Sequence, residues 1–184
     1  MKAIVLLSGG IDSTACLKFY LDLSYEVECI FCDYGQPASA PELQAAKIIS
    51  GIYGVPLHII TTTSLSIPSS GEICGRNALL VLQALCFMGF GTYKIILGIH
   101  AGSNYADCSS NFVVSMNRIL DYYANGTVCL EAPFSDWNKH DIIAYCKEKG
   151  ITYDITYSCE KGTIPPCGKC LSCLDRKGDF DEPV

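Results

Sequence analysis

The sequence predicts an α/β fold: a doubly wound, parallel, five-stranded sheet with a small metal-binding knuckle near the C-terminal end. Short apolar runs alternate along the chain with longer amphipathic stretches, which is the pattern of repeated β–α units. The first apolar run ends in a glycine-rich turn, and ligands of such sheets bind beyond the carboxyl ends of the strands. Four cysteines lie close together in the tail, at a spacing typical of metal ligands.

Each element follows from its local pattern. Expected strands are the β-branched and apolar runs at residues 3–7, 26–32, 57–60, 94–98 and 128–130. Expected helices are the stretches at residues 14–23, 41–51, 78–85, 111–123 and 139–149. The third of these is almost wholly apolar, so we expect it to be buried. Gly150 follows the last helix where a left-handed residue often ends one, and a polar loop is expected at residues 61–70. Four residues are expected at the carboxyl ends of strands, where a ligand would bind: Ser8, Asp33, Tyr34 and His100.

Composition restricts the class of protein. The chain has 184 residues, of which 49% are apolar and 17% charged, and this indicates a globular protein. Its formal charge of -6 argues against a nucleic-acid-binding surface, which needs clustered Lys and Arg. The first residues show no signal-peptide pattern and no apolar run is long enough to cross a bilayer, so we expect a cytoplasmic protein with no membrane partner. Seven of the twelve cysteines are scattered in apolar or helix-like surroundings and are expected to act as small hydrophobes: Cys16, Cys29, Cys32, Cys74, Cys86, Cys129 and Cys146.

The glycine loop, residues 8–13 (Ser-Gly-Gly-Ile-Asp-Ser), follows the first expected strand. Its glycines permit a sharp turn and a close approach to a ligand, and Asp12 or Ser13 is expected to cap the next helix. Free N–H groups at a helix start form an anion site suited to phosphate. The Walker and dinucleotide patterns are absent. The loop resembles the pyrophosphate loop of the ATP pyrophosphatase superfamily, and an ordinary strand-to-helix turn is the structural alternative. The residues expected to bind ATP are Leu7, Ser8, Gly9, Gly10, Ile11, Asp12, Ser13 and Thr14.

The tail carries the second candidate site. Its expected metal ligands are Cys159, Cys167, Cys170 and Cys173. Two Cys-x-x-Cys steps share Cys170, and four thiolates suit the closed tetrahedral site of a structural zinc ion. An iron–sulfur cluster is the alternative, but the polar, lysine-containing surroundings favour zinc. We expect the metal to fold the tail against the sheet.

Motifs along nearly the whole chain resemble those of the 7-cyano-7-deazaguanine synthase family. They are Tyr34-Gly35-Gln36, Glu42-Leu43-Gln44-Ala45-Ala46, Gly75-Arg76-Asn77, Asp107-Cys108, Asn138-Lys139, Thr156-Tyr157-Ser158-Cys159, the cysteines from Cys167 to Cys173, and Arg176. The resemblance implies an ATP-binding α/β domain at residues 1–150 and a zinc-binding segment at 151–184 packed on it. It is compatible with a homodimer.

The resemblance also implies the chemistry. The family adenylates the carboxylate of 7-carboxy-7-deazaguanine with ATP and Mg²⁺, and ammonia then converts it through the amide to the nitrile. The implied partners are therefore ATP, the deazaguanine acid and ammonia, and no nucleic acid. A carboxylate needs a good leaving group before ammonia can displace it, and AMP supplies one.

Three residues are candidates for catalysis and four for substrate binding. Lys139 is expected to place a cation near the phosphates, and Asp12 to help hold Mg²⁺. Arg76 is expected to pair with a carboxylate or phosphate, and Asp107 to accept from N–H groups of the base. Solvent exposure of Lys139, a surface ion pair of Arg76 and a turn at Asp107 are the structural alternatives. The full substrate set is Gln36, Arg76, Asn77 and Asp107, and the full catalytic set is Lys139, Asp107 and Asp12.

Departures from the family pattern leave alternatives open. Basic residues expected after Tyr34-Gly35-Gln36 are replaced by Pro37-Ala38-Ser39, and the Pro and Arg expected beside Asp107-Cys108 are Ala106 and Ser109. The loop before Gly75 is also short. One alternative is a synthase-like enzyme of a bacterial antiphage defence system that couples the activated deazaguanine to a protein amine. Others are a tRNA-thiolating enzyme with the same loop, against which the acidic charge speaks, and a non-enzymatic zinc-knuckle adaptor, against which the intact loop speaks.

Overall fold

A computed structural model of the chain describes residues 1–62, 73–102 and 105–178. Its sheet has five parallel strands in the order β3-β2-β1-β4-β5. The strands are β1 Lys2–Leu6, β2 Glu26–Asp33, β3 Leu57–Thr61, β4 Tyr93–Ile96 and β5 Val128–Glu131. The predicted α/β class, the strand number and the parallel direction are confirmed.

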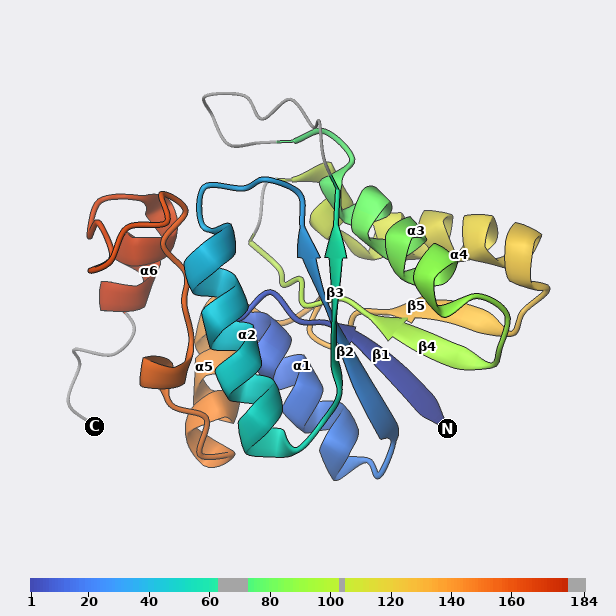
Figure 1. Cartoon of the computed structure of the whole chain (residues 1–184), viewed down its shortest axis with the longest axis horizontal. Coiled ribbons are helices and arrows are strands. Elements are labelled where there is room, and N and C mark those ends of the chain that lie inside the picture. The colour runs from blue at the N-terminus through green and yellow to red at the C-terminus, as the bar shows by residue number, and fades with distance from the viewer. Residues whose placement is uncertain (63–72, 103–104, 179–184) are drawn as a thin grey trace.

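Helices cover both faces of the sheet (Figure 1). On one face lie α1 Ile11–Asp22, α2 Ser39–Tyr53 and α5 Lys139–Glu148, and on the other lie α3 Arg76–Met88 and α4 Ser110–Ala124. Short 3-10 turns occur at Ala106–Cys108 and Tyr153–Ile155, and α6 Leu171–Gly178 stands at one side of the molecule, beyond α2. The order of strands reverses beside β1, because β2 and β4 flank it and the chain winds outward in both directions.

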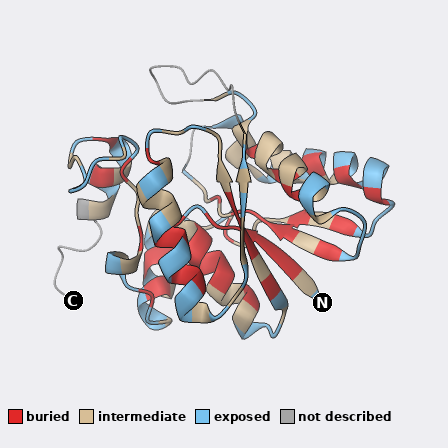
Figure 2. Ribbon diagram, in the orientation of Figure 1, coloured by how far each residue is buried: buried red, intermediate tan, exposed pale blue. Residues whose placement is uncertain are grey.

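The central strand β1 divides the core into two halves. Ala3 and Val5 face the layer of α1, α2 and α5, whereas Ile4 and Leu6 face the layer of α3 and α4. All four are at most 6% exposed, and Figure 2 shows the buried colour continuing along β1 and its neighbours. A continuous apolar run, rather than an alternating one, is what a strand covered on both faces requires.

Two expectations are wrong in part. The apolar helix, now α3, buries only Asn77, Val81 and Ala84, because it packs on the sheet with a single face, and Phe87 is 49% exposed. Among the seven scattered cysteines, Cys74 and Cys86 are exposed, which does not suit a small hydrophobe, and Cys32 and Cys129 are only partly covered; Cys16, Cys29 and Cys146 are buried, as that role requires.

Several other expectations are settled by the described residues. All twelve cysteines lie among them and each is a free thiol. No described helix has the length and hydropathy to cross a bilayer. Gly150, with φ of +68°, ends α5 as predicted. Most of the polar loop expected at 61–70 lies outside the described residues.

Candidate active site

A cavity of about 360 Å³ lies at the carboxyl ends of β1 and β4, where the strand order reverses. Such switch points are where ligands of doubly wound sheets bind. The cavity is lined by the glycine loop, the end of β2, the starts of α2, α3 and α5, the residue pair Gly98 and His100 after β4, and the tail from Tyr153 to Arg176. Ser8, Tyr34 and His100 line it as expected, and Asp33 does not.

The glycine loop turns directly into α1. The helix starts at Ile11, earlier than predicted, and Gly10 is its N-cap with no side chain capping it. The predicted cap by Asp12 or Ser13 is therefore wrong: both lie inside the first turn, where the Ser13 hydroxyl donates to the Gly10 carbonyl at 3.0 Å. An uncapped helix start leaves first-turn N–H groups able to bind an anion.

Two glycines allow the backbone to come close around this loop. Gly9 has φ of +82°, and a Cβ there would lie 2.5 Å from the Glu42 carbonyl oxygen. A Cβ on Gly98 would lie 2.9 Å from the backbone nitrogen of Ser13. The loop is thus held between α2 and the end of β4, and neither position has room for a side chain.

Of the residues expected to bind ATP, six line the cavity: Leu7, Ser8, Gly10, Ile11, Asp12 and Ser13. The other two support the loop from behind. Gly9 packs on α2, and the buried Thr14 donates its hydroxyl to the Gly10 carbonyl at 2.8 Å.

Lys139 and Asp12 meet across the cavity although 127 positions separate them in the chain. The Lys139 Nζ lies 2.7 and 2.8 Å from the two carboxylate oxygens of Asp12. Both side chains are about a quarter exposed. Lys139 is the first residue of α5, whose N-terminal end is closed by a capping box between Asn138 and Asp141. The capping box fixes the helix start, and the helix start aims the ammonium group at the glycine loop.

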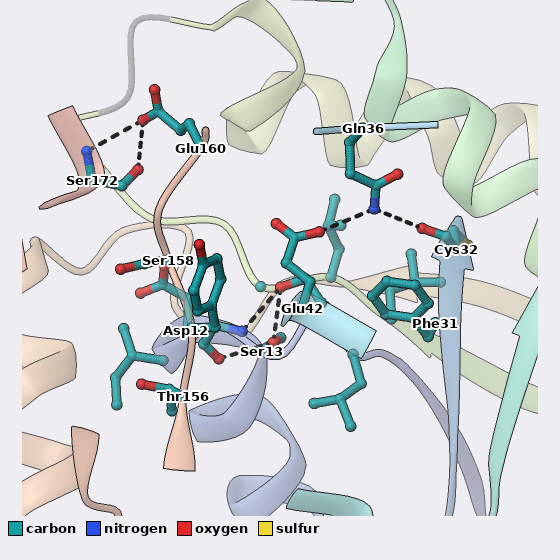
Figure 3. Close-up of a pocket in the computed structure, with 18 of the residues that line it drawn as sticks. Asp12, Ser13, Phe31, Cys32, Gln36, Glu42, Thr156, Ser158, Glu160 and Ser172 are labelled. Carbon is teal, nitrogen blue, oxygen red and sulfur yellow. Dashed lines mark hydrogen bonds between the residues drawn. The ribbon is translucent and has the colours of Figure 1, made fainter. Parts of the chain in front are cut away.

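The opposite wall carries the partly buried carboxylate of Glu42, which the sequence analysis named in a family motif but did not predict as a site residue. The Gln36 Nε2 donates to Glu42 Oε2 at 3.0 Å and to the Cys32 carbonyl at 3.2 Å, and Gln36 Oε1 accepts from the Tyr34 N–H at 2.9 Å. Figure 3 shows the hydrogen bonds of Gln36 to Glu42 and to Cys32, together with Thr156 and Ser158 of the tail. Burial raises the pKa of the Glu42 carboxyl, and Gln36 and the charge of Arg76 offset this only in part.

Arg76, Asn77 and Gln36 line the cavity, as their expected role in substrate binding requires. Asp107 does not: its Oδ2 accepts from the Asn77 backbone N–H at 3.0 Å, and its carbonyl accepts from the Asn77 side chain at 2.9 Å. Asp107 is thus not among the residues that line the cavity, and both of these hydrogen bonds join it to Asn77 at the start of α3.

The tail closes the cavity and is fastened to the glycine loop. The Tyr157 N–H donates to the Gly9 carbonyl at 2.9 Å. From α6, Arg176 donates to the carbonyls of Thr156 (3.1 Å) and Tyr153, and its guanidinium lies 4.7 Å from the Tyr153 ring centre. Tyr157 and Ser158 are cavity-lining residues that spacing alone could not assign. In the sequence they belong to the family motif that ends at Cys159, which gave them no role of their own.

The four tail cysteines form a site that could hold a metal ion. All four sulfur atoms of Cys159, Cys167, Cys170 and Cys173 lie within 4.8 Å of one another. A tetrahedral ion with sulfur ligands at about 2.3 Å needs sulfurs roughly 3.8 Å apart, and Cys167 and Cys173 are separated by 4.0 Å. Burial acts to raise the pKa of Cys159, but N–H donors including that of Cys167, with the Thr163 hydroxyl, lower it to about 5. Such donors stabilise thiolates, the form that binds metal.

Comparisons with known proteins agree with these features. The family model described as "Queuosine biosynthesis protein QueC" matches residues 2–72 and 66–183. The 7-cyano-7-deazaguanine synthase of Caldicellulosiruptor bescii is 34% identical, over 96% of this chain and 90% of its own. That of Oceanobacillus iheyensis is 29% identical, over 98% and 94%. The first alignment spans 204 positions against 184 residues here, so the relative carries segments that this chain lacks.

Two solved structures share the fold at low identity. The U34-tRNA thiolase NcsA from Methanococcus maripaludis, with its [4Fe-4S] cluster, has a TM-score of 0.57 at 14% identity and covers 98% of this chain and 64% of its own. The NMN synthetase from Francisella tularensis has a TM-score of 0.53 at 13% identity, covering 100% and 78%. These likenesses concern the fold alone, whereas the family match extends over almost every residue. The chain therefore belongs to the QueC family of queuosine biosynthesis proteins.

Proposed function

We propose that this protein is an ATP-dependent carbon–nitrogen ligase that adenylates 7-carboxy-7-deazaguanine and, with ammonia, converts it through the amide to 7-cyano-7-deazaguanine. Membership of the QueC family and the curated synthases among its relatives support the substrate. The observation that carries the reaction type is the cavity, where an uncapped helix start and the Lys139–Asp12 pair face each other.

The first step needs a triphosphate held by its tail. The substrate carboxylate oxygen attacks the α-phosphorus, the bond to the bridging oxygen breaks, and pyrophosphate leaves. First-turn N–H groups of α1 are suited to bind the departing pyrophosphate, and Lys139 adds a positive charge where negative charge develops. Asp12 positions Lys139 through two hydrogen bonds.

The second half consumes the acyl adenylate. Ammonia adds to the carbonyl carbon, AMP leaves, and a proton is lost to give the amide. A second ATP then adenylates the amide oxygen, with release of pyrophosphate and of one proton from the nitrogen. AMP departs as the remaining N–H proton is lost, and the nitrile is formed. In this proposal Arg76, Asn77 and Gln36 bind the deazaguanine acid, because they line the cavity wall across from the glycine loop.

Two metals belong to the proposal. The four tail cysteines would hold a structural zinc ion, which supplies rigidity to the wall formed by the tail. Asp12 would hold Mg²⁺ together with ATP, since carboxylate and phosphate oxygens are its usual ligands. The zinc proposal rests on the closeness of the thiols and on the polar segment around them.

The test is incubation with ATP, Mg²⁺ and 7-carboxy-7-deazaguanine, with and without ammonia. Mass spectrometry should find AMP and pyrophosphate, with amide and nitrile only when ammonia is present. Transfer of the deazaguanine to a protein amine would instead support the defence-system alternative, which the named relatives do not favour. Absence of AMP with any deazapurine acid would exclude the proposed reaction.

A further inference from the structure

We propose that Glu42 is the specificity residue that selects a guanine-type base, by accepting hydrogen bonds from the ring N–H and the exocyclic amino group of the substrate. This inference rests on the proposed function and deepens it, because it assigns the recognition of the base to one side chain. The earlier expectation gave this role to Asp107, which lies outside the cavity and is bonded to Asn77.

Among the residues that the structure describes, four carboxylates line the cavity. Of the three besides Glu42, two are already hydrogen-bonded to charged or polar partners, and the third is exposed. Asp12 is bonded through both oxygens to Lys139. Glu160 accepts from the Ser172 hydroxyl at 2.7 Å and from its N–H at 3.2 Å. Asp175 is exposed on α6. Glu42 is partly buried, and within the described residues its carboxylate accepts one hydrogen bond, from the neutral amide of Gln36.

That single bond leaves most of the acceptor capacity of Glu42 unused. An ionised carboxylate offers about four lone-pair sites on two oxygens, and Gln36 occupies one site on Oε2. Burial makes the unused sites costly, because a desolvated carboxylate is stabilised only by donors that reach it. A ligand with two adjacent N–H groups supplies such donors in the bidentate arrangement that carboxylates favour.

The chemistry of the base decides which purine fits. A guanine-type ring presents two neighbouring donors on one edge, the ring N–H and the amino group. Adenine presents an acceptor beside its amino group, so the lone pair of its ring nitrogen would face a carboxylate that can only accept, and one hydrogen bond would be lost. Glu42 therefore selects the deazaguanine rather than the adenine of ATP.

The surroundings hold the carboxylate for this task. Gln36 is itself fixed by the Cys32 carbonyl and the Tyr34 N–H, so its amide orients Glu42 rather than following it. Tyr34 and Tyr157 line the same cavity and offer aromatic surface to a flat base. The Glu42 backbone is locked as well, because it packs against Gly9 of the glycine loop.

The test compares two substrates in two proteins. The substrates are 7-carboxy-7-deazaguanine and the same acid without its 2-amino group, and the measurement is kcat/KM for AMP formation. The wild-type protein should prefer the amino substrate by roughly 10- to 150-fold, the value of a hydrogen bond to a charged group. In Glu42→Gln this preference should collapse to within about threefold, because the amide replaces one acceptor by a donor.

A matched control is Glu26→Gln, which makes the same chemical change at an exposed position at the start of β2, away from the cavity. It should keep the wild-type preference. Glu42→Asp retains the carboxylate and should also prefer the substrate with the amino group. If Glu42→Gln has a lowered melting temperature, comparison with Glu42→Asp separates loss of the carboxylate from loss of stability.

Each outcome is decisive for one of the two proposals. Equal use of both acids by the wild-type protein, or an undiminished preference in Glu42→Gln, overturns the role of Glu42 and leaves the proposed reaction intact. Calorimetric titration of the protein with each of the two acids, in the absence of ATP, tests the role of Glu42 separately from the reaction. Suppose that the wild-type protein binds the acid that carries the 2-amino group more tightly, that Glu42→Gln removes this difference in affinity, and that no AMP is formed. The proposed reaction is then wrong, and the role of Glu42 in recognising the base stands.

Discussion

Replacing Lys139 with methionine tests the electrostatic part of the proposed reaction. The substitution keeps an unbranched side chain of similar length, and removes the positive charge that lies 2.7 and 2.8 Å from the Asp12 oxygens. It also leaves the Asp12 carboxylate unpaired beside the place proposed for the triphosphate. Both consequences act against the developing negative charge of the first step.

The expected effects on activity and on stability differ in size. Loss of one preorganised donor to a transition-state charge costs about 10²- to 10³-fold in kcat. The ion pair itself is 27% and 24% exposed, and pairs of this kind contribute only about 0–1 kcal/mol to folding. For a domain of this size that corresponds to a decrease of roughly 2–4 °C in melting temperature for each 1 kcal/mol.

The assay is single-turnover release of pyrophosphate from ATP with the deazaguanine acid, followed beside thermal unfolding. Lys149→Met is the matched control: Lys149 is similarly exposed and pairs with Asp22 at 3.4 Å, outside the cavity. It should retain wild-type kcat. A rate for Lys139→Met within threefold of wild type would refute the proposed role, as would a loss of activity that simply follows a large loss of folded protein.

Three further predictions concern the glycine loop, the metal and the carboxyl of Glu42. Gly98→Ala should weaken ATP binding at least tenfold in a calorimetric titration, because its Cβ would lie 2.9 Å from the start of α1, whereas Gly91→Ala, with its nearest neighbour at 3.5 Å, should not. Elemental analysis should find one zinc and no iron per chain; Cys170→Ser should lower both the zinc content and the melting temperature, and Cys86→Ser, at an exposed position, should change neither. Burial raises the pKa of the Glu42 carboxyl above its ordinary value of 4.5. The stability that the protonated carboxyl contributes is therefore fully present below pH 4.5 and is lost as the pH rises through the pKa of the folded protein. Glu42→Gln should therefore gain stability relative to wild type at pH 7 and lose that gain at pH 4, as measured by denaturant unfolding.

Much of the fold could be predicted because the sheet is covered on both faces. A strand such as β1 must then be apolar wherever helices cover it, here from Ala3 to Leu6, which makes it easy to recognise. The right-handed connections leave few topologies. The burial of α3 was overestimated because an apolar composition does not show how many faces of a helix are covered. Its composition is apolar all round, yet a helix in an outer layer has only one neighbour to pack against, and Phe87 remains half exposed.

The candidate site could be predicted where it is local in sequence and not where it is assembled by folding. The glycine loop and the cysteine cluster each occupy one short stretch, so their spacing carries the chemistry. Glu42 belongs to one of the family motifs, but nothing in its spacing indicated a role, because a glutamate in the first turns of a helix is ordinary in sequence. Only the contact with Gly9 and the hydrogen bond from Gln36 bring it into the cavity.

Packing of the tail explains why Pro37 and Ala38 replace the expected basic residues. A Cβ on Gly162 would lie 2.0 Å from the Pro37 carbonyl oxygen, and Ala38 is 2% exposed. The loop between Cys159 and Cys167 therefore packs directly on this turn, and long charged side chains have no room at Ala38. Because Tyr157 is bonded to Gly9 two residues before Cys159, the same packing fixes the glycine loop. The proposed metal site and the proposed phosphate site are thus joined through a few backbone contacts, and binding of metal by the tail should change the affinity for ATP.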